Sequence, residues 1–205
     1  SGNAMSAVEI ACVVAAYLLG SVSFAVIVSK GFGLDDPRTY GSKNPGATNV
    51  LRSGRKIAAV LTLLGDALKG VVAVWLARLI DPSLMSALGI AAVAVAVVVG
   101  HMWPVFFRFV GGKGVATAAG VLFVLQPLLG LYTLLVWLGT VLATRISSTG
   151  ALAAGVAAPI LAWWLIPDLP SQLAVLGISL LLISRHHQNI VGLIKGTEGR
   201  LGKKA

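Results

Sequence analysis

The sequence GHMWPVFFRFVGGKGVAT, residues 100–117, joins two long apolar runs through a polar, glycine-rich turn. Gly111, Gly112 and Gly114 surround Lys113, and an apolar segment suited to a helix begins directly after them. Glycines allow backbone N–H groups to converge, and a helix start carries partial positive charge, so this turn is suited to bind an anion. It is not a Walker A loop, because Gly114 stands where that motif requires Ser or Thr. The alternative interpretation is a plain turn between two membrane helices.

The composition identifies the class of protein. Of the 205 residues, 57% are hydrophobic and 11% are charged, and the mean hydropathy is +0.92. A soluble domain of this size has too little interior for that apolar fraction, so we expect a polytopic membrane protein. The apolar runs are continuous rather than alternating, which indicates helices. We therefore expect an all-α fold with seven transmembrane helices, in the runs 7–28, 56–80, 84–107, 113–126, 128–144, 150–166 and 171–184.

The distribution of charge predicts the orientation in the membrane. If the N-terminus is outside, all of the 16 Lys and Arg residues except Lys69 and Arg78 fall in segments on the inside. Basic connections stay in the cytoplasm, so we expect the N-terminus out and the C-terminus in. The same rule accounts for the net charge of +9, and no nucleic-acid partner is expected. Residues 1–4 are interpreted as a remnant of expression cloning, and residues 5–205 as a single transmembrane domain.

The first inside connection, residues 30–56, is the longest polar segment of the chain. It is rich in hydroxyl, amide and cationic side chains, and its acids end at Asp36. Connections of this length are usually functional or disordered. Because hydrogen-bond donors here lack nearby acids, the segment favours an anionic ligand, with a solvated linker as the alternative.

Two ionisable residues, Asp66 and Lys69, lie in the middle of the second apolar run. They share one face of a helix, and ionisable groups in a membrane usually face the bundle interior and pair. We interpret them as a structural ion pair, with Lys69 lending its charge to the site as the alternative. The neighbouring His186 and His187 diverge on a helix and lack Cys or clustered acids beside them, so no metal is expected.

Five motifs occur in a fixed order along the chain: YLLGSVSFA at 17–25, GSKNPGATNVLR at 41–52, GDALKG at 65–70, GHMWPVFFRFVGGKGVAT at 100–117 and RHHQNI at 185–190. With these motifs the sequence resembles the bacterial acyl-phosphate:glycerol-3-phosphate acyltransferases, which are integral membrane enzymes of phospholipid synthesis. The resemblance covers nearly the whole chain from Tyr17 onward. Lys43 departs from it by standing where a glycine is common, and His187 and Gln188 replace an Arg-Glu pair. Glu198 keeps an acid of the family that we interpret as structural.

The resemblance implies transfer of a fatty acyl group from acyl phosphate to the 1-hydroxyl of sn-glycerol 3-phosphate, giving 1-acyl-sn-glycerol 3-phosphate and phosphate without a cofactor. It implies a multi-pass protein of the bacterial inner membrane with its active site on the cytoplasmic face. A separate peripheral enzyme makes the acyl phosphate, and contact with it is a further expectation. The implied catalytic residues are Ser42, Arg52, Lys113, His186 and Asn189. The implied substrate-binding residues are Gly41, Asn44, Gly46, Thr48, Asn49, His101, Gly111, Gly112, Gly114 and Ser148.

The expected chemistry leaves the general base open. Acyl phosphate is already activated, so no acyl-enzyme intermediate is needed, and the task is to place a hydroxyl and stabilise an oxyanion. His101, His186 or a phosphate oxygen of the donor could take the proton, and we favour the phosphate oxygen. The alternative function is an organic-phosphate transporter, which predicts polarity through the bundle and an internal repeat. Only Asp66 and Lys69 lie in mid-span, and no repeat is evident.

Overall fold

The computed structural model describes residues 4–202, and within them every regular element is a helix. The predicted all-α class is therefore confirmed. Residues 1–3 of the expected cloning remnant, and Lys203 and Lys204 of the predicted inside segment, lie outside the described residues. The elements are α1 (Ala7–Gly20), α2 (Phe24–Gly31), α3 (Ala47–Leu51), α4 (Lys56–Arg78), α5 (Ala87–Met102), the 3-10 turn η1 (Val105–Phe107), α6 (Val115–Leu125), α7 (Pro127–Thr144), α8 (Ser147–Leu165), α9 (Leu169–Arg185) and α10 (His187–Lys195).

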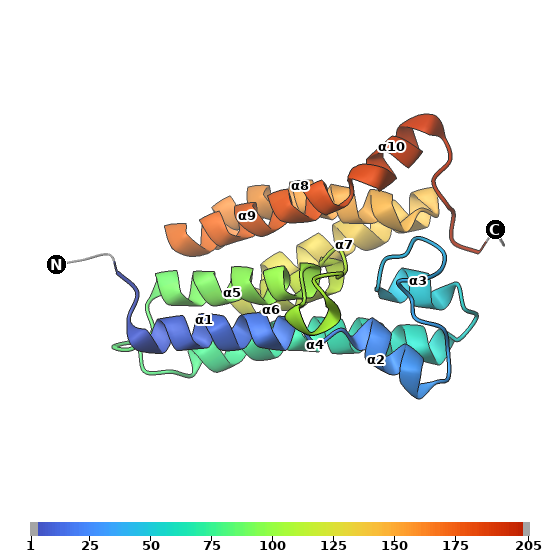
Figure 1. Ribbon diagram of the computed structural model, residues 1–205. Helices are drawn as coiled ribbons and strands as arrows, with labels where there is room; N and C mark the ends of the chain where they lie inside the picture. The colour runs from blue at the N-terminus through green and yellow to red at the C-terminus, as the bar shows by residue number, and fades with distance from the viewer. Residues whose placement is uncertain (1–3, 203–205) are drawn as a thin grey trace.

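The long helices lie along one common direction, with the N-terminus at one end and α3, α10 and the last described residues at the other (Figure 1). Small residues bring the helices together. A Cβ on Gly20 of α1 would lie 2.1 Å from the Val97 carbonyl oxygen of α5, and one on Gly120 of α6 would lie 2.1 Å from the Ala67 carbonyl of α4. Close approach through small residues is the usual way in which membrane helices pack.

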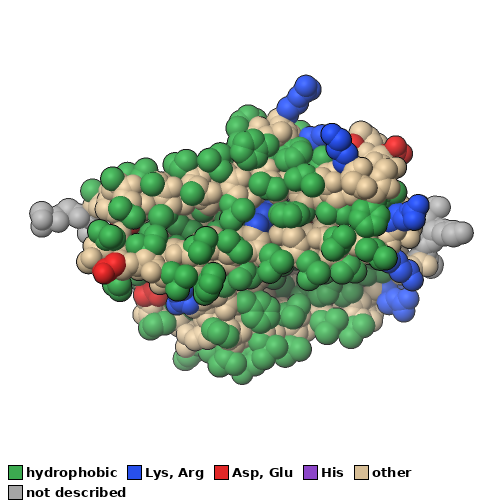
Figure 2. Space-filling view, turned by 90° about the horizontal axis from the view of Figure 1, so that it is seen from below, with side chains coloured by type: hydrophobic (Ala, Val, Ile, Leu, Met, Phe, Trp, Pro, Cys, Tyr) green, Lys and Arg blue, Asp and Glu red, His purple; other side chains and the backbone are tan. Residues whose placement is uncertain are grey.

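The exterior of the bundle is apolar along its length. Large side chains are among the most exposed, with Trp164 at 80% and Leu142 at 69% of full exposure. Figure 2 shows hydrophobic side chains over most of the long face, with Lys and Arg gathered mainly toward the end that carries α3 and the C-terminus. An apolar belt with one basic end is typical of a helical protein embedded in a bilayer.

Five helical segments are long and apolar enough to cross a membrane: Ala7–Gly31, Lys56–Arg78, Ala87–Phe107, Pro127–Thr144 and Ser147–Leu165. A sixth candidate joins α9 and α10, which bend by 54° at their junction. The predicted run 113–126 corresponds to α6, which has only 11 residues. That helix rises about 16 Å, against a hydrocarbon core of about 30 Å. The seven-span topology and its orientation therefore stay predictions.

Two irregular segments place polar backbone inside the bundle. Residues 21–23 separate α1 from α2 within the first predicted run. The connection between α5 and α6 lies near the middle of the bundle's long axis rather than at its end (Figure 1). Because α6 begins there, it is short, and the glycine-rich turn lies deeper than a surface connection. Such backbone is tolerated in a membrane protein only where other groups of the protein satisfy it or it lines a cavity.

Candidate functional site

A chain of hydrogen bonds joins four side chains from separate parts of the sequence. The Lys113 ammonium, in the turn before α6, donates to Oδ1 of Asn189 in α10. Nδ2 of Asn189 donates to Oε1 of Glu198 at 2.5 Å, and Oγ of Ser148 donates to the same oxygen at 2.7 Å. Three of these residues, Lys113, Asn189 and Ser148, were predicted site residues, and the structure brings them together.

The ammonium of Lys113 is partly withdrawn from solvent. Burial lowers the pKa of Lys113 below its ordinary value, and the nearby cations Arg185 and Arg52 lower it further, whereas Glu198 opposes this shift. Three cations therefore gather against one carboxylate. Such an arrangement is suited to bind an anionic group, because a phosphate would relieve the repulsion among the cations.

Asn49 organises the first polar loop. Its side chain is 1% exposed, and its Nδ2 donates to the carbonyl oxygens of Pro37 at 2.8 Å and Tyr40 at 3.1 Å. Its Oδ1 accepts from the Ser42 backbone N–H at 3.2 Å and from Arg52 Nη1 at 3.4 Å. Asn49 was predicted to bind substrate, but its amide is occupied within the loop. It holds the exposed Ser42 and Arg52 in place.

Two contacts connect this loop to the Lys113 cluster. The hydroxyls of Thr48 and Ser147 lie 3.2 Å apart, which links the loop to the first residue of α8. A Cβ on Gly199 would lie 3.5 Å from Arg52 Nη2, so Arg52 lies against the segment that carries Glu198. The predicted catalytic residues of the first loop thus lie on the same side of the molecule as Lys113.

The glycine-rich turn is held from two sides. The Gly112 backbone N–H donates to the carbonyl oxygen of His101 at 3.1 Å. On the other side Arg185 donates to the carbonyl oxygens of Gly111 at 3.0 Å and Gly112 at 3.3 Å. Gly114 has a φ of 85°, in the left-handed region that favours glycine, and it starts α6. The backbone N–H groups at this helix start are suited to meet an anion.

The two predicted histidines are both buried but in different settings. His101 is 8% exposed, its Nδ1 lies 3.5 Å from Asp66 Oδ1, and a Cβ on Gly112 would lie 2.2 Å from its Nε2. It therefore lies behind the glycine-rich turn. His186 lies between α9 and α10, with Nδ1 2.7 Å from the Leu182 carbonyl oxygen. Since that oxygen only accepts, Nδ1 of His186 carries the hydrogen and Nε2 is left as an acceptor.

The remaining predicted residues shape the first loop. Gly41 has a φ of 56°, and a Cβ there would lie 2.3 Å from Asn49 Oδ1. Gly46 is the residue before α3, and its N–H donates to the Asn44 carbonyl oxygen at 2.9 Å. Lys43 also has a φ of 56°, a left-handed conformation that explains why glycine would be common at this position.

Comparisons with known proteins show the family of the chain. A family model described as Glycerol-3-phosphate acyltransferase matches residues 10–196. The chain belongs to this family. It is 59% identical over 197 residues to a glycerol-3-phosphate acyltransferase of Neisseria meningitidis, covering 96% of this chain and 98% of that protein. It is 57% identical over 196 residues to that of Laribacter hongkongensis, covering 95% and 97%. The chain is therefore an acyltransferase.

Solved structures show the same fold. The crystal structure of PlsY, an integral membrane glycerol 3-phosphate acyltransferase, in its glycerol 3-phosphate form matches with a TM-score of 0.88 and 38% identity. The match covers 95% of this chain and 96% of that one. The lysophosphatidic acid form of PlsY matches with a TM-score of 0.86 and 37% identity.

Two residues of the site were missed as site residues from the sequence. Glu198 was interpreted as structural, yet it accepts hydrogen bonds from Asn189 and Ser148. Arg185 was noted only as a basic residue, yet it holds the glycine-rich turn and its guanidinium lies 5.4 Å from the centre of the Trp103 ring. Its place at the start of the RHHQNI motif was the available signal.

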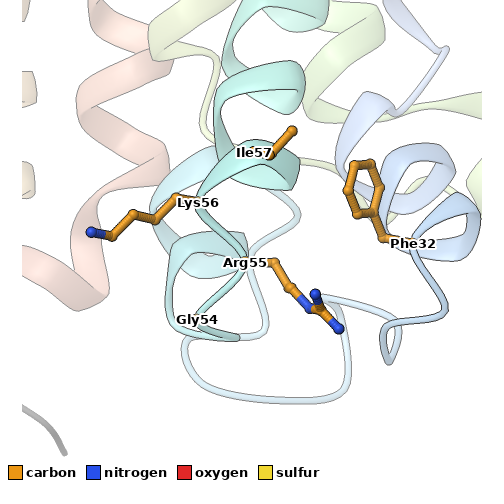
Figure 3. Close-up of a pocket in the computed structure, with 5 residues that line it drawn as sticks. All are labelled: Phe32, Gly54, Arg55, Lys56 and Ile57. Carbon is orange, nitrogen blue, oxygen red and sulfur yellow. The ribbon is translucent and has the colours of Figure 1, made fainter.

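A separate hollow between the end of α2 and the start of α4 is lined by Phe32, Gly54, Arg55, Lys56 and Ile57 (Figure 3). The Arg55 side chain extends to the same side of α4 as Phe32, whereas Lys56 points away to the other side (Figure 3). The five lining residues include none of the predicted site residues, so this hollow is distinct from the Lys113 cluster.

Proposed function

We propose that this acyltransferase transfers a fatty acyl group from acyl phosphate to the 1-hydroxyl of sn-glycerol 3-phosphate in phospholipid synthesis. The observation that carries the proposal is the hydrogen-bonded cluster of Lys113, Asn189, Ser148 and Glu198, with Arg52 beside it. The family membership and the glycerol 3-phosphate form of PlsY support the same acceptor. The acyl phosphate donor rests on the resemblance in the motifs.

The proposed reaction needs binding and orientation more than covalent chemistry by the enzyme. The acceptor oxygen attacks the carbonyl carbon of the mixed anhydride. The tetrahedral intermediate then collapses as the bond between that carbon and the bridging oxygen breaks, and phosphate leaves with the bridging oxygen. Lys113, Arg52 and the backbone N–H groups before α6 supply positive charge and donors for the phosphates and the developing oxyanion. Holding both substrates close together in the reactive orientation accounts for a large part of the rate enhancement.

The proton of the acceptor hydroxyl passes in this proposal to an oxygen of the departing phosphate. The positions of the histidines favour that route over His101, whose ring lies behind Gly112 and beside Asp66. His186 keeps an unprotonated Nε2 and is the remaining side-chain candidate. Because the proposed base is the phosphate oxygen, replacing His186 by Gln should reduce turnover only modestly. Complete loss of turnover with intact substrate binding would instead identify His186 as the base.

We further propose seven spans, with the N-terminus outside and the site on the cytoplasmic face of the bacterial inner membrane. The basic end of the molecule, which holds α3 and α10, supports this orientation. The same basic end offers a surface for contact with the peripheral enzyme that makes acyl phosphate. Replacing Arg200 or Pro82 by Cys and labelling each variant in intact and in lysed cells would show which of the two residues faces the outside.

The test is phosphate release by purified protein in detergent. Acyl phosphate with glycerol 3-phosphate should give phosphate and 1-acyl-glycerol 3-phosphate, and acyl phosphate alone should give neither. Lys113→Ala should raise the KM for glycerol 3-phosphate by about tenfold to a hundredfold. The exposed Lys195→Ala is the matched control and should leave it unchanged. Uptake of glycerol 3-phosphate into proteoliposomes without acyl transfer would instead support the transporter alternative.

A further inference from the structure

A buried polar cluster in the middle of the bundle takes no proton and forms no bond in the proposed reaction. Asp66 and Lys69 of α4 are each 2% exposed, and His101 of α5 is 8% exposed. Lys69 Nζ lies 3.0 Å from Asp66 Oδ1, and His101 Nδ1 lies 3.5 Å from the same oxygen. Ionisable groups at this depth are costly and are retained where they serve a function.

Lys69 is fully engaged away from the phosphate site. Besides Asp66, its ammonium donates to the carbonyl oxygens of Gly20 at 2.9 Å and Val22 at 2.8 Å. These carbonyls belong to the break between α1 and α2, where the helix leaves them without their usual partners. Two N–H donors of the ammonium are therefore used by these carbonyls, and its charge is paired with Asp66 rather than directed at Lys113.

His101 connects this cluster to the glycine-rich turn. One side of its ring faces Asp66, and the other faces Gly112, where a Cβ would lie 2.2 Å from Nε2. Its backbone carbonyl also accepts the Gly112 N–H at 3.1 Å. Both the ring and the backbone of His101 thus contact the residue immediately before Lys113.

We propose that Asp66, Lys69 and His101 are positioning residues that hold Gly112, and through it Lys113, in the geometry that binds the phosphate of the acceptor. The proposal rests on the proposed function of Lys113. Asp66 orients the imidazole, and Lys69 fixes Asp66 to the broken first helix. The imidazole edge then sets the position of Gly112.

The glycine-rich turn needs this support because of its depth in the bundle. Its backbone lies inside the bundle, where bulk water cannot hold it and other groups of the protein must. A glycine-rich segment has the largest conformational freedom of any sequence, so it needs such support to keep a defined shape. A shift of about 1 Å in a binding group can change the reaction rate a hundredfold.

The first test compares Asp66→Asn with Thr133→Val. Thr133 is also buried, and its hydroxyl lacks a hydrogen-bond partner among the described residues. Thr133→Val therefore changes a buried polar side chain that takes no part in holding the glycine-rich turn. Asp66→Asn should raise the KM for glycerol 3-phosphate by about tenfold to a hundredfold and leave the KM for acyl phosphate within about twofold. An Asp66→Asn protein that unfolds at lower temperature but keeps its KM would overturn the proposal.

The second test is a double-mutant cycle that does not depend on Asp66 variants. Gly112→Ala introduces a methyl group that meets the His101 ring, so the KM for the acceptor should rise. His101→Ala removes that ring, and the double variant should bind the acceptor no worse than Gly112→Ala alone. Fully additive losses would show that His101 does not set the position of Gly112 and would overturn the proposal. The Pro45 carbonyl, 3.1 Å from the same Cβ position, stays in all variants.

Different results would contradict the proposed function and the positioning role of Asp66, Lys69 and His101. If the unmodified protein transfers no acyl group to glycerol 3-phosphate, the proposed function is wrong. If it does, and Lys113→Ala raises the KM for the acceptor while Asp66→Asn does not, only the positioning role is wrong.

Discussion

The side-chain amide of Asn189 donates a hydrogen bond of 2.5 Å to the carboxylate of Glu198. The opposite end of the same amide accepts from Lys113. Asn189 therefore connects a carboxylate to an ammonium and is fixed in orientation by both. The segment after α10 supplies the acid, so an element near the end of the chain completes a site built mainly from earlier loops.

Replacing Glu198 by Gln should reduce kcat/KM for glycerol 3-phosphate by about tenfold to a hundredfold. The change leaves Asn189 and Ser148 with a weaker, uncharged acceptor and removes the anion closest to the cations of the site. Steady-state kinetics at a fixed acyl phosphate concentration measure the effect. Asp35→Asn removes the same charge from an exposed position of the first loop and should be neutral. Equal losses in both variants would indicate a general charge effect.

The pH dependence of acceptor binding should follow Lys113. Burial lowers the pKa of Lys113, and the ammonium binds phosphate only while it is protonated. Binding is therefore fully present below this lowered pKa and is lost as the pH rises through it, earlier than for an ordinary lysine. Lys113→Arg should move this alkaline limb to higher pH, because a guanidinium stays protonated. If the alkaline limb stays at the same pH in Lys113→Arg, the loss of binding is caused by the titration of another group.

The composition predicted the helical membrane class, because apolar runs are a local property, whereas Lys113, Asn189 and Ser148 were implied by the resemblance in the motifs. The sequence did not predict that Glu198 would join Asn189, since that contact depends on how the C-terminal segment folds back. It also did not predict the depth of the glycine-rich turn, which lies near mid-length of the bundle (Figure 1). That depth depends on where α5 ends, and α5 is apolar without interruption up to Gly100.

The two central histidines show a similar limit. Motif position made both His101 and His186 site candidates, yet the structure places His101 between Asp66 and Gly112. Asp66 and His101 are far apart in sequence and lie on different helices. Only the packing of α4 against α5 brings them together, so the spacing of Asp66 and Lys69 indicated the ion pair but not its third member.

Replacing Arg185 by Lys should raise the KM for glycerol 3-phosphate by about tenfold. Arg185 holds two successive carbonyl oxygens, those of Gly111 and Gly112, while its guanidinium stacks near Trp103. A lysine keeps the charge but cannot hold two acceptors in one plane. The matched control is Arg200→Lys at an exposed position, for which no change is expected. If Arg185→Lys behaves like Arg200→Lys, the charge alone is sufficient, and the two hydrogen bonds of the planar guanidinium are not needed.

Replacing Glu9 by Gln should lower stability without changing catalysis. Glu9 of α1 is 5% exposed and accepts from the Ser6 N–H at 2.7 Å, the Ser86 N–H at 2.8 Å and the Ser86 hydroxyl at 2.5 Å. These bonds tie the start of α1 to the residue that caps α5, at the end of the bundle remote from α3.

Hydrogen bonds to a charged group are stronger than those between neutral groups, so the Glu9 variant should unfold at a lower temperature in detergent. Its KM for both substrates should stay the same, because the start of α1 lies away from Lys113. Asp81→Asn alters an exposed acid at the same end and should change the unfolding temperature less. A Glu9→Gln protein with normal stability but a raised KM would mean that the two ends of the bundle are coupled, since α1 and α5 then transmit the change to the turn after α5.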